Sequence, residues 1–307
     1  MPVGRIAAII NRTHNDWYGD KVGFFGFFDC CEDPSIASAL FERARSELQV
    51  RKCDRLRGPY NPTVNDECGL LVDGFEYPPL VMMPYNPPYY MKLYEGLGLQ
   101  PVKDLYAFYV PAANEAPERV RKIVERVKRT TGITLRTVNK KKLKEELLII
   151  QELFNLSWKD NWGFVPLSRE DLEFAAGDLK AIIDPNLVMF AEKDGVPVGF
   201  SVTIPDINEF MLRVKRSSSW LRVLRFIWSM KTSHPSQARL ALLGVRPDFR
   251  NTGIAALFYY ETLMRGKRKY VGGELSWVLE DNHVLTKSIE VMGGRRYKTY
   301  RIFEAAL

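Results

Sequence analysis

The sequence predicts an α/β chain built from two tandem copies of one unit, of which the first is incomplete. Two stretches begin alike, PVGRIAAIIN at Pro2 and PVGFSVTIPDIN at Pro197, and each has the pattern of a strand after a turn. An Asn follows Gly4 by 82 residues and Gly199 by 83 residues, and each Asn precedes a Gly by 12 residues. Landmarks that keep this spacing over such a distance indicate a tandem duplication.

The composition fits a globular chain with two cores. Its 307 residues are 46% hydrophobic and 26% charged, which excludes disorder and a small disulfide scaffold. The 44 Lys and Arg exceed the 37 Asp and Glu by 7, a modest surplus that suits an anionic ligand and gives little support to nucleic-acid binding. The cysteines at positions 30, 31, 53 and 68 lack metal-ligand spacing, so we expect no metal site and a reducing, cytoplasmic setting. We find neither a signal peptide nor a membrane span.

The upstream part of the second unit predicts a strand, two helices and a hairpin. GITLRTVN at 132–139 is rich in β-branched residues and predicts the strand. The next stretch predicts an amphipathic helix, whose apolar face carries Leu143, Leu147, Ile150 and Leu153. A Ser cap and acidic residues open a second helix at 168–183. The turn dipeptide Asp194-Gly195 then predicts a β-hairpin.

The first unit begins at the position of the second arm of that hairpin. It therefore lacks the upstream part, and we expect it to depend on the second unit for its missing sheet edge. A Pro- and Ala-containing connector at 110–119 separates the units, and a short helix follows it. We place the domains at 1–112 and 118–307, each closed by an aromatic strand.

One turn in the second unit carries the clearest chemical signal. A predicted strand, ARLALLGV, passes through a Pro-Asp turn into a helix that begins near Thr252. The first N–H groups of a helix have no partner within it, and the helix dipole favours negative charge, so this turn predicts an anion site. Gly253 lets a phosphate approach the backbone, the small side chain of Ala255 leaves room for it at the next turn, and Arg250 adds positive charge. The glycine patterns of Walker and Rossmann loops are missing.

RNTGIA at 250–255 resembles the Q/R-x-x-G-x-G/A loop of the GNAT superfamily of N-acyltransferases. The resemblance includes the preceding LLGVRPDF, the strand GELSWVLEDN and the helix from Asn282 to Gly293-Gly294, and the repeat extends it to most of the chain. It implies tandem GNAT-like units of a prokaryotic subgroup. Each unit would be a mixed, mostly antiparallel twisted sheet flanked by helices. The implied co-substrate is acetyl-CoA or another acyl-CoA, with no metal.

The resemblance also implies roles for individual residues. Amides of the loop would bind the pyrophosphate of coenzyme A, and the strand before it would hold the thioester carbonyl and the pantetheine arm through its backbone at a bulge. Asn282 would contact the pantetheine, and it also suits a helix N-cap. The implied cofactor-binding residues are Leu243, Gly244, Val245, Arg250, Asn251, Thr252, Gly253, Ile254, Ala255 and Asn282.

The corresponding turn of the first unit carries acidic residues. Asp29, Glu32 and Asp33 stand where a phosphate would lie, so they would cap the helix and repel pyrophosphate. We therefore expect a single acyl-CoA site, in the second unit. The first unit would shape the cleft of the acceptor.

The second unit lacks the usual catalytic residues of the superfamily. The strand QARLALLGV has no Asp or Glu, and the usual Tyr position holds Ile289 or Glu290. The first unit has Tyr94 at that position but lacks the loop. Glu274 and Tyr297 are therefore our candidates for general base and general acid, acting directly or through water, and Glu280 and Tyr300 are further candidates.

Two segments are candidates for acceptor recognition. Trp162 and Phe164 lie in the stretch 158–168, which in the superfamily often forms the acceptor wall, although packing between the units would explain them equally well. The inserted segment LRVKRSSSWLRVLRFIWSMKTSH mixes basic and large apolar residues. It predicts either a helical lid over the cleft or a basic amphipathic helix in peripheral contact with a membrane.

Together these observations predict an acyl-CoA-dependent N-acyltransferase. We expect it to transfer acetyl from acetyl-CoA to a primary amine of a small, amino-acid-like metabolite. Two alternatives remain open at the level of sequence. One is a non-catalytic acyl-CoA sensor, which would explain the missing Glu and Tyr, and the other is a Fem-type aminoacyl or peptidyl transferase.

Overall fold

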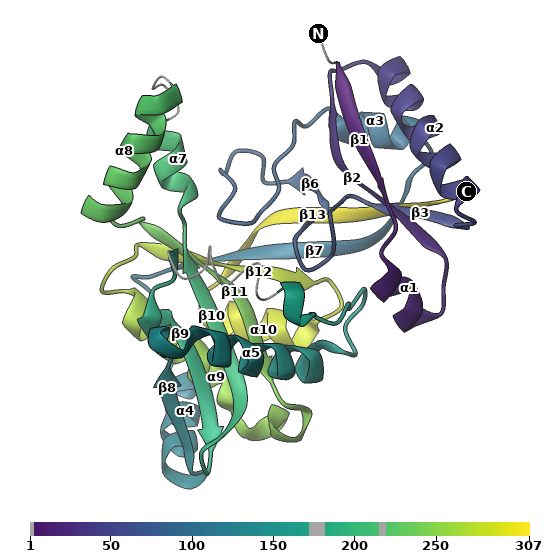
Figure 1. The fold of residues 1–307 in the computed structure, drawn as a ribbon. Coiled ribbons are helices and arrows are strands. Elements are labelled where there is room, and N and C mark those ends of the chain that lie inside the picture. Colours follow the sequence, from purple (N-terminus) through teal and green to yellow (C-terminus); the bar gives the residue numbers. More distant parts are fainter. Residues whose placement is uncertain (1–2, 172–181, 215–218) are drawn as a thin grey trace.

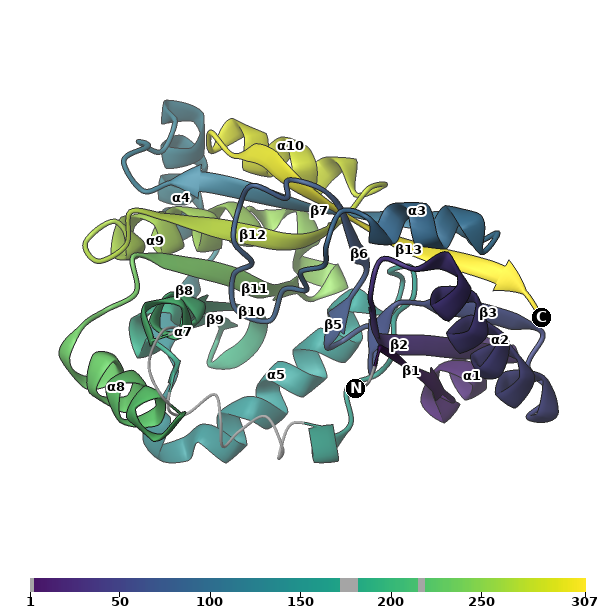
Figure 2. The ribbon, with the colours of Figure 1, turned by 90° about the horizontal axis from the view of Figure 1, so that it is seen from above.

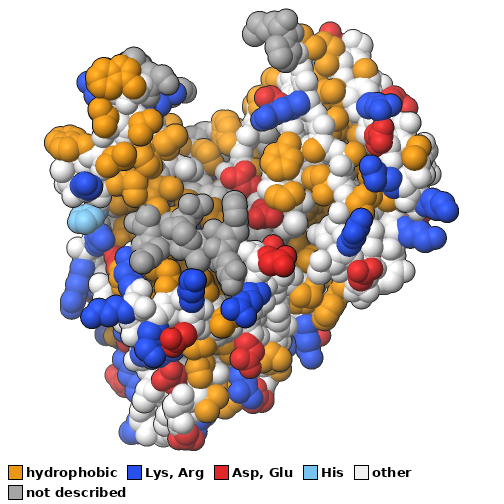
Figure 3. Space-filling model, in the orientation of Figure 1, with side chains coloured by type: hydrophobic (Ala, Val, Ile, Leu, Met, Phe, Trp, Pro, Cys, Tyr) orange, Lys and Arg blue, Asp and Glu red, His pale blue; other side chains and the backbone are white. Residues whose placement is uncertain are grey.

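The computed structural model describes residues 3–171, 182–214 and 219–307. A long twisted sheet runs through the molecule, and helices pack on both of its faces (Figures 1 and 2). The surface view shows two lobes with a hollow between them (Figure 3). The predicted α/β class with a twisted sheet is confirmed.

The first unit combines short strands with three helices in its described residues. Its strands are β1 (Gly4–Ile9), β2 (Val22–Cys30), β3 (Arg55–Gly58), β4 (Tyr60–Asn61), β5 (Glu67–Cys68), β6 (Leu70–Asp73) and β7 (Gln100–Pro111). Its helices are α1 (Arg12–Tyr18), α2 (Pro34–Val50) and α3 (Tyr90–Gly96). α2 starts where it does because Asp33 caps it and Pro34 occupies its first position.

The second unit follows the predicted order. Its strands are β8 (Ile133–Thr137), β9 (Val188–Lys193), β10 (Val196–Pro205), β11 (Gln237–Val245), β12 (Gly272–Leu279) and β13 (Arg295–Ala306). Its helices are α4 (Glu118–Thr130), α5 (Leu143–Trp158), α7 (Asn208–Val214), α8 (Ser219–Thr232), α9 (Ile254–Gly266) and α10 (His283–Val291), with 3₁₀ turns at Lys140–Lys142, Pro185–Leu187 and Pro247–Thr252. Most of the helix predicted at 168–183 lies outside the described residues.

The predicted hairpin at Asp194-Gly195 is confirmed. Both residues have positive φ, 53° and 79°, which is the backbone of a two-residue hairpin turn between β9 and β10. A β-branched residue at either position would be strained there, because its side chain disfavours positive φ.

The order of strands in the sheet shows the duplication. The 11-stranded sheet runs β1-β2-β3-β13-β7-β12-β11-β10-β9-β8, and β6 also pairs with β13. In the first unit β1 pairs antiparallel with β2, which pairs parallel with β3. The second unit repeats this pattern, since β10 pairs antiparallel with β11 and β11 pairs parallel with β12. Gly4 faces Cys30 in one unit, and Gly199 faces Val245 in the other.

The two units exchange their last strands. β13 of the second unit lies between β3 and β7, and β7 of the first unit lies between β13 and β12. The sequence places the units at 1–112 and 118–307, but hydrogen bonds of the sheet cross that boundary. The edge that the first unit lacks lies beside β1, where β2 is the only neighbour among the described strands, so the expectation that the second unit supplies this edge is wrong. The two units depend on each other in the middle of the sheet instead, through β7 and β13.

Candidate functional site

β11 and β12 separate partway along their length. They pair at four positions, Gln237–Leu240 with Gly272–Leu275, and along the rest of both described strands no pairing between them continues. At the same place β11 has a bulge, because Ala241 is an extra residue without a partner on β10. The bulge bends β11 away from β12. The two strands therefore open into a V-shaped gap.

α9 begins at the wide end of this gap without a side-chain cap. Its N-cap residue, Gly253, has φ +92° and ψ 6°, and no side chain accepts a hydrogen bond from the first turn. A Cβ on Gly253 would lie 2.8 Å from Cγ2 of Val127 and 3.0 Å from Cγ2 of Ile123, both on α4. The left-handed backbone and the packing of α4 therefore require this glycine, whereas the sequence suggested a close approach of phosphate. The uncapped amides fit an anionic group.

The loop before α9 is tied to α5. Nη2 of Arg250 donates to the carbonyl of Ser157 at 2.9 Å, and the guanidinium lies 3.8 Å from Asp160. Nε1 of Trp158 donates to the carbonyl of Leu243 on β11 at 3.3 Å. Arg250 therefore fixes the loop as well as adding charge. Asn251 next to it is exposed.

Asn282 is the N-cap of α10, as its sequence position suggested. Its Oδ1 accepts a hydrogen bond from the amide of Leu285 at 3.2 Å. Capping uses the side-chain oxygen and not the amide nitrogen. The role implied by the superfamily, a contact with pantetheine, is compatible with the cap.

A buried polar cluster lies beside the gap. Glu274 on β12 has no exposed surface, and its Oε1 accepts a hydrogen bond from the Ser276 hydroxyl at 2.5 Å. The Tyr297 hydroxyl donates to its Oε2. Two cations flank the carboxylate, Nζ of Lys298 at 3.7 Å and Nε of Arg239 at 3.8 Å. The structure thus brings Glu274 and Tyr297, two separate predictions from sequence, into direct contact.

Burial controls the protonation of this cluster. It raises the pKa of Tyr297, and the negative charge of Glu274 raises it further. Burial lowers the pKa of Lys298, although the nearby carboxylate opposes that shift. It also lowers the pKa of Arg239. Tyr297 therefore stays protonated at neutral pH and acts as a donor to Glu274.

The segment 78–83 of the first unit covers the cluster. Its carbonyls accept hydrogen bonds from Lys298 at 2.7 Å, from Arg239 at 3.1 Å and from Asn208 at 3.0 Å. The amide of Val81 donates to Asp206 at 2.9 Å. Burial raises the pKa of Asp206 to about 6. The first unit thus forms one wall of this cluster.

Two buried polar groups near the cluster lack a partner among the described residues. They are the hydroxyl of Tyr300 on β13 and Nε1 of Trp277 on β12. The ring of Trp277 lies under the guanidinium of Arg239, at 5.3 Å. Buried polar groups are normally hydrogen-bonded. Tyr300 is fully buried, so only the half-buried Trp277 is a candidate for contact with a bound polar molecule.

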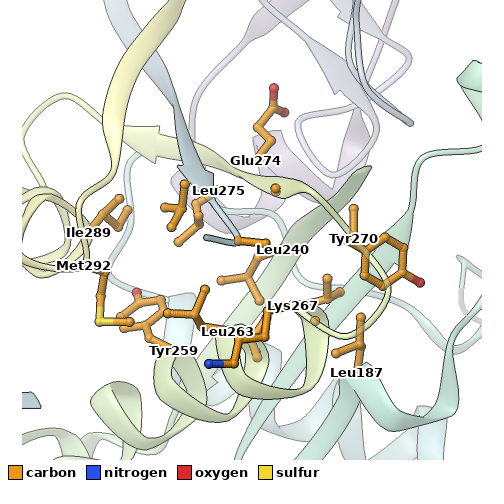
Figure 4. A pocket seen from close by; sticks show the side chains of 18 residues that line it. Leu187, Leu240, Tyr259, Leu263, Lys267, Tyr270, Glu274, Leu275, Ile289 and Met292 are labelled. Carbon is orange, nitrogen blue, oxygen red and sulfur yellow. The ribbon is translucent and has the colours of Figure 1, made fainter. Parts of the chain in front are cut away.

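An apolar cavity of about 80 Å³ lies on the α9 side of the sheet (Figure 4). Tyr259 and Leu263 of α9 line it together with Met292 after α10, and the last paired residues before the gap, Leu240 and Leu275, also face it. The Glu274 side chain points away from the cavity in Figure 4. The cavity and the polar cluster therefore meet at the start of the gap from opposite sides of β12.

The equivalent gap in the first unit is filled by the chain itself. Oδ1 of Asn61 accepts a hydrogen bond from the amide of Phe27 at 2.7 Å, and Gly26 contacts the backbone of Tyr60. Asp33 caps α2 by accepting from the amide of Ser35 at 2.8 Å, which confirms the expected carboxylate cap.

Tyr94 is buried in the core of the first unit. Its ring packs against Phe25, Phe41 and Phe303, and its side chain is almost fully buried. It therefore has no access to a substrate. A buried hydroxyl in such surroundings is a packing residue.

The candidate acceptor residues from the loop have different positions. Phe164 is buried and packs against Phe154 and Trp17, so it is a core residue. Trp162 lies at the border with the first unit, between the charges of Arg57 and Lys103. Another candidate, Glu280, forms an ion pair with Lys103 at 3.6 Å. Neither Phe164 nor Glu280 belongs to the Glu274 cluster.

Sequence reasoning missed Arg239, Ser276 and Lys298. Arg239 offered a signal, since it is a charged residue in an otherwise apolar strand. Within the described ranges, no three or more His, Cys, Asp and Glu side chains are grouped to hold a metal ion. None of the helices in those ranges has the length and apolar character needed to cross a membrane.

No family model matches the chain. Two curated proteins match almost all of it. Protein YghO of Escherichia coli (strain K12) is 33% identical over 308 residues, which cover 98% of this chain and 78% of that protein. Bacterial ceramide synthase of Caulobacter vibrioides is 34% identical over 314 residues, which cover 99% of this chain and 81% of that protein.

Solved structures share the fold at low sequence identity. A tandem GNAT protein from the clavulanic acid biosynthesis pathway has a TM-score of 0.56 at 13% identity, covering 99% of this chain and 79% of its own. A GCN5-related N-acetyltransferase from Sphaerobacter thermophilus has a TM-score of 0.51 at 15% identity, covering 98% of this chain and 76% of its own. The chain therefore has the fold of tandem GNAT proteins, and it belongs to the family that includes YghO and bacterial ceramide synthase.

Proposed function

We propose that the protein is an N-acyltransferase that moves a long acyl chain from an acyl-CoA thioester to the primary amine of a lipid-like acceptor. The observation that carries this proposal is the gap between β11 and β12, where uncapped amides, an apolar cavity and a buried carboxylate cluster meet. The relative named bacterial ceramide synthase supports the choice of substrates. A ceramide is an amide between a fatty acid and a long-chain amino alcohol.

The nucleotide end of the acyl-CoA would bind at the N-terminus of α9. The amides of Ile254 and Ala255 would hold the pyrophosphate, because they open α9 without a side-chain cap and lie at the positive end of the helix dipole, with Asn251 and Thr252 in the 3₁₀ turn just before them. The backbone of Leu243–Val245 would accompany the pantetheine, with Asn282 on the other side of the gap. The filled gap and capped helix of the first unit support a single site in the second.

The cavity favours an acyl chain longer than acetyl. It starts between Leu240 and Leu275, at the narrow end of the gap, where the thioester would lie. Its lining is mostly aliphatic and aromatic, and each methylene buried there would contribute about 0.8 kcal/mol. An acetyl group would end before the cavity and gain none of this free energy.

The polar cluster would handle the protons of the reaction. Tyr297 accepts a proton from the attacking amine while its own proton moves to Glu274, to which it is hydrogen-bonded. The nitrogen forms a bond to the thioester carbon, and the carbon–sulfur bond then breaks. The proton returns through Tyr297 to the leaving thiolate. Arg239 and Lys298 flank the Glu274 carboxylate at 3.8 and 3.7 Å.

The acceptor would approach from the side of the cluster. The unpartnered Nε1 of the half-buried Trp277 would hydrogen-bond its polar head, and the segment 78–83 would limit the access of water. In this proposal the amine would lie on the face of the sheet opposite the acyl chain. The nitrogen can then reach the thioester through the gap.

The test uses the purified full-length protein with palmitoyl-CoA and sphinganine. We expect release of free thiol together with an amide product of the corresponding mass, and a higher kcat/KM for palmitoyl-CoA than for acetyl-CoA. Tight binding of acyl-CoA without amide formation from any amine would overturn the proposal and favour the sensor alternative. Equal efficiency with acetyl-CoA and palmitoyl-CoA would overturn the assignment of the cavity.

A further inference from the structure

α8 has a complete apolar stripe that no other part of the described chain covers. The stripe consists of Trp220, Val223, Leu224, Ile227 and Trp228, at the spacing of one helix face. These side chains are 45 to 68% exposed. Such a face is normally buried, and contiguous exposed apolar patches mark interaction sites. A lid closed over the cleft would cover this face, and here it is uncovered.

The stripe is held away from the body of the protein. Phe226, on another side of α8, packs against Phe210 of α7, with ring centroids 6.4 Å apart. α7 adds Met211 and Leu212, which are both about half exposed. Figure 1 shows α7 and α8 projecting from the sheet, and hydrophobic side chains gather on this lobe in Figure 3.

The base of this α7–α8 hairpin is firmly attached. Glu209 of α7 accepts hydrogen bonds from the amides of Ser236 and Gln237, each at 2.9 Å, where β11 begins. The carboxylate of Asp206, just before α7, holds Val81 in the segment that covers the Glu274 cluster. The hairpin therefore rises directly beside the acceptor side of the candidate site.

The charges on α8 indicate which kind of partner binds the apolar stripe. The helix carries Arg222, Arg225 and Lys231 and has no acidic residue. A second copy of the chain docked through the same face would bring like charges together. An anionic membrane surface complements them, and Trp residues at the ends of the stripe suit the interface between headgroups and acyl chains.

We propose that the α7–α8 hairpin docks on the surface of a bilayer that contains anionic lipids, with its apolar stripe in the headgroup region. The helix lies along the interface and does not span it. Docking brings the hollow between the two lobes against the membrane surface. Membrane docking is a separate property from the proposed reaction, and vesicle binding can be measured without it.

The first experiment is co-sedimentation with vesicles of phosphatidylcholine alone and with vesicles that also contain phosphatidylglycerol. We expect binding to the anionic vesicles, a decrease with added salt, and a blue shift of Trp emission. The double substitution Trp220→Ser/Trp228→Ser should weaken the affinity for anionic vesicles at least about tenfold. Lys231→Glu should weaken binding to anionic vesicles only. Val50→Ser, at an exposed apolar position on α2 outside the stripe, is the control and should bind like the wild type.

Thermal unfolding and light scattering accompany the binding assay. Unchanged melting of the double Trp variant shows that its fold is intact, since the replaced side chains are exposed. Unchanged amide formation with detergent-dispersed substrates separates docking from catalysis. Wild-type binding by the double variant, no binding to any vesicle, or a dimer that this variant converts to a monomer would each overturn the proposal.

Discussion

Replacing Glu274 with Gln tests the catalytic cluster most directly. The substitution keeps the size of the side chain and one acceptor oxygen, for either Ser276 or Tyr297, but it replaces the other oxygen with an amide donor and removes the negative charge. Lys298 and Arg239, at 3.7 and 3.8 Å, then remain buried without a counter-charge. Breaking a buried ion pair in this way costs about 3–5 kcal/mol, so we expect the free energy of unfolding to fall by that amount. Loss of the proton acceptor should lower kcat by about 10²–10⁴.

A compensating variant separates the two effects. Glu274→Gln combined with Lys298→Met removes one surplus cation, so it should recover part of the free energy of unfolding without recovering kcat. Tyr297→Phe is the converse control, because it interrupts the proton path and leaves the charges balanced. Thiol release with palmitoyl-CoA and sphinganine gives kcat, and urea unfolding gives stability.

Two results would refute this reasoning. One is a folded Glu274→Gln variant whose kcat stays within about threefold of the wild type, well short of the loss expected for general base catalysis. The other concerns the double variant Glu274→Gln/Tyr297→Phe. Residues that act as a unit have non-additive effects, so the two losses should not multiply. If they multiply, the residues do not share one proton path.

Three further predictions concern the loop, the cavity and the wall of the site. Asn251→Asp adds a charge beside the uncapped amides, so acyl-CoA binding measured by calorimetry should weaken about tenfold, although an acidic residue at a helix N-terminus does not lower stability. Leu263→Trp fills the cavity, so kcat/KM should shift from long to short acyl-CoA; unchanged chain-length preference would contradict the assignment. Burial raises the pKa of Asp206 to about 6 from an unfolded value near 3.8, so its protonation favours the folded state as pH falls. The wild type should gain about 1.4 kcal/mol relative to Asp206→Asn between pH 8 and pH 5, measured by urea unfolding.

Local chemistry made part of this site visible in the sequence. Asn282 and Asp33 are caps because a side chain at that position reaches the next amides, which depends only on neighbouring residues. The loop 250–255 is recognisable for the same reason. Glu274 and Tyr297 could be named as candidates, but their contact depends on the register of separate strands.

The remainder depends on long-range packing that sequence patterns do not reveal. Arg239 and Lys298 reach Glu274 from strands that are distant in the sequence, and segment 78–83 reaches them from the other unit. Gly253 illustrates the same limit. Its identity is set by the side chains of α4, which lies more than 100 residues earlier in the chain.

The exchange of strands explains why a unit without its own acyl-CoA site is part of this one. β7 stands between β12, which carries Glu274, and β13, which carries Lys298, and it pairs with both. Opposite Lys298, β7 has Ala107, whose small side chain leaves room for the long side chains of the outer strands to meet across it. Without the first unit, β12 and β13 would lose the strand that sets their distance and register. The first unit therefore sets the distance between Glu274 and Lys298 and also forms a wall of the polar cluster, although its own gap is closed by Asn61.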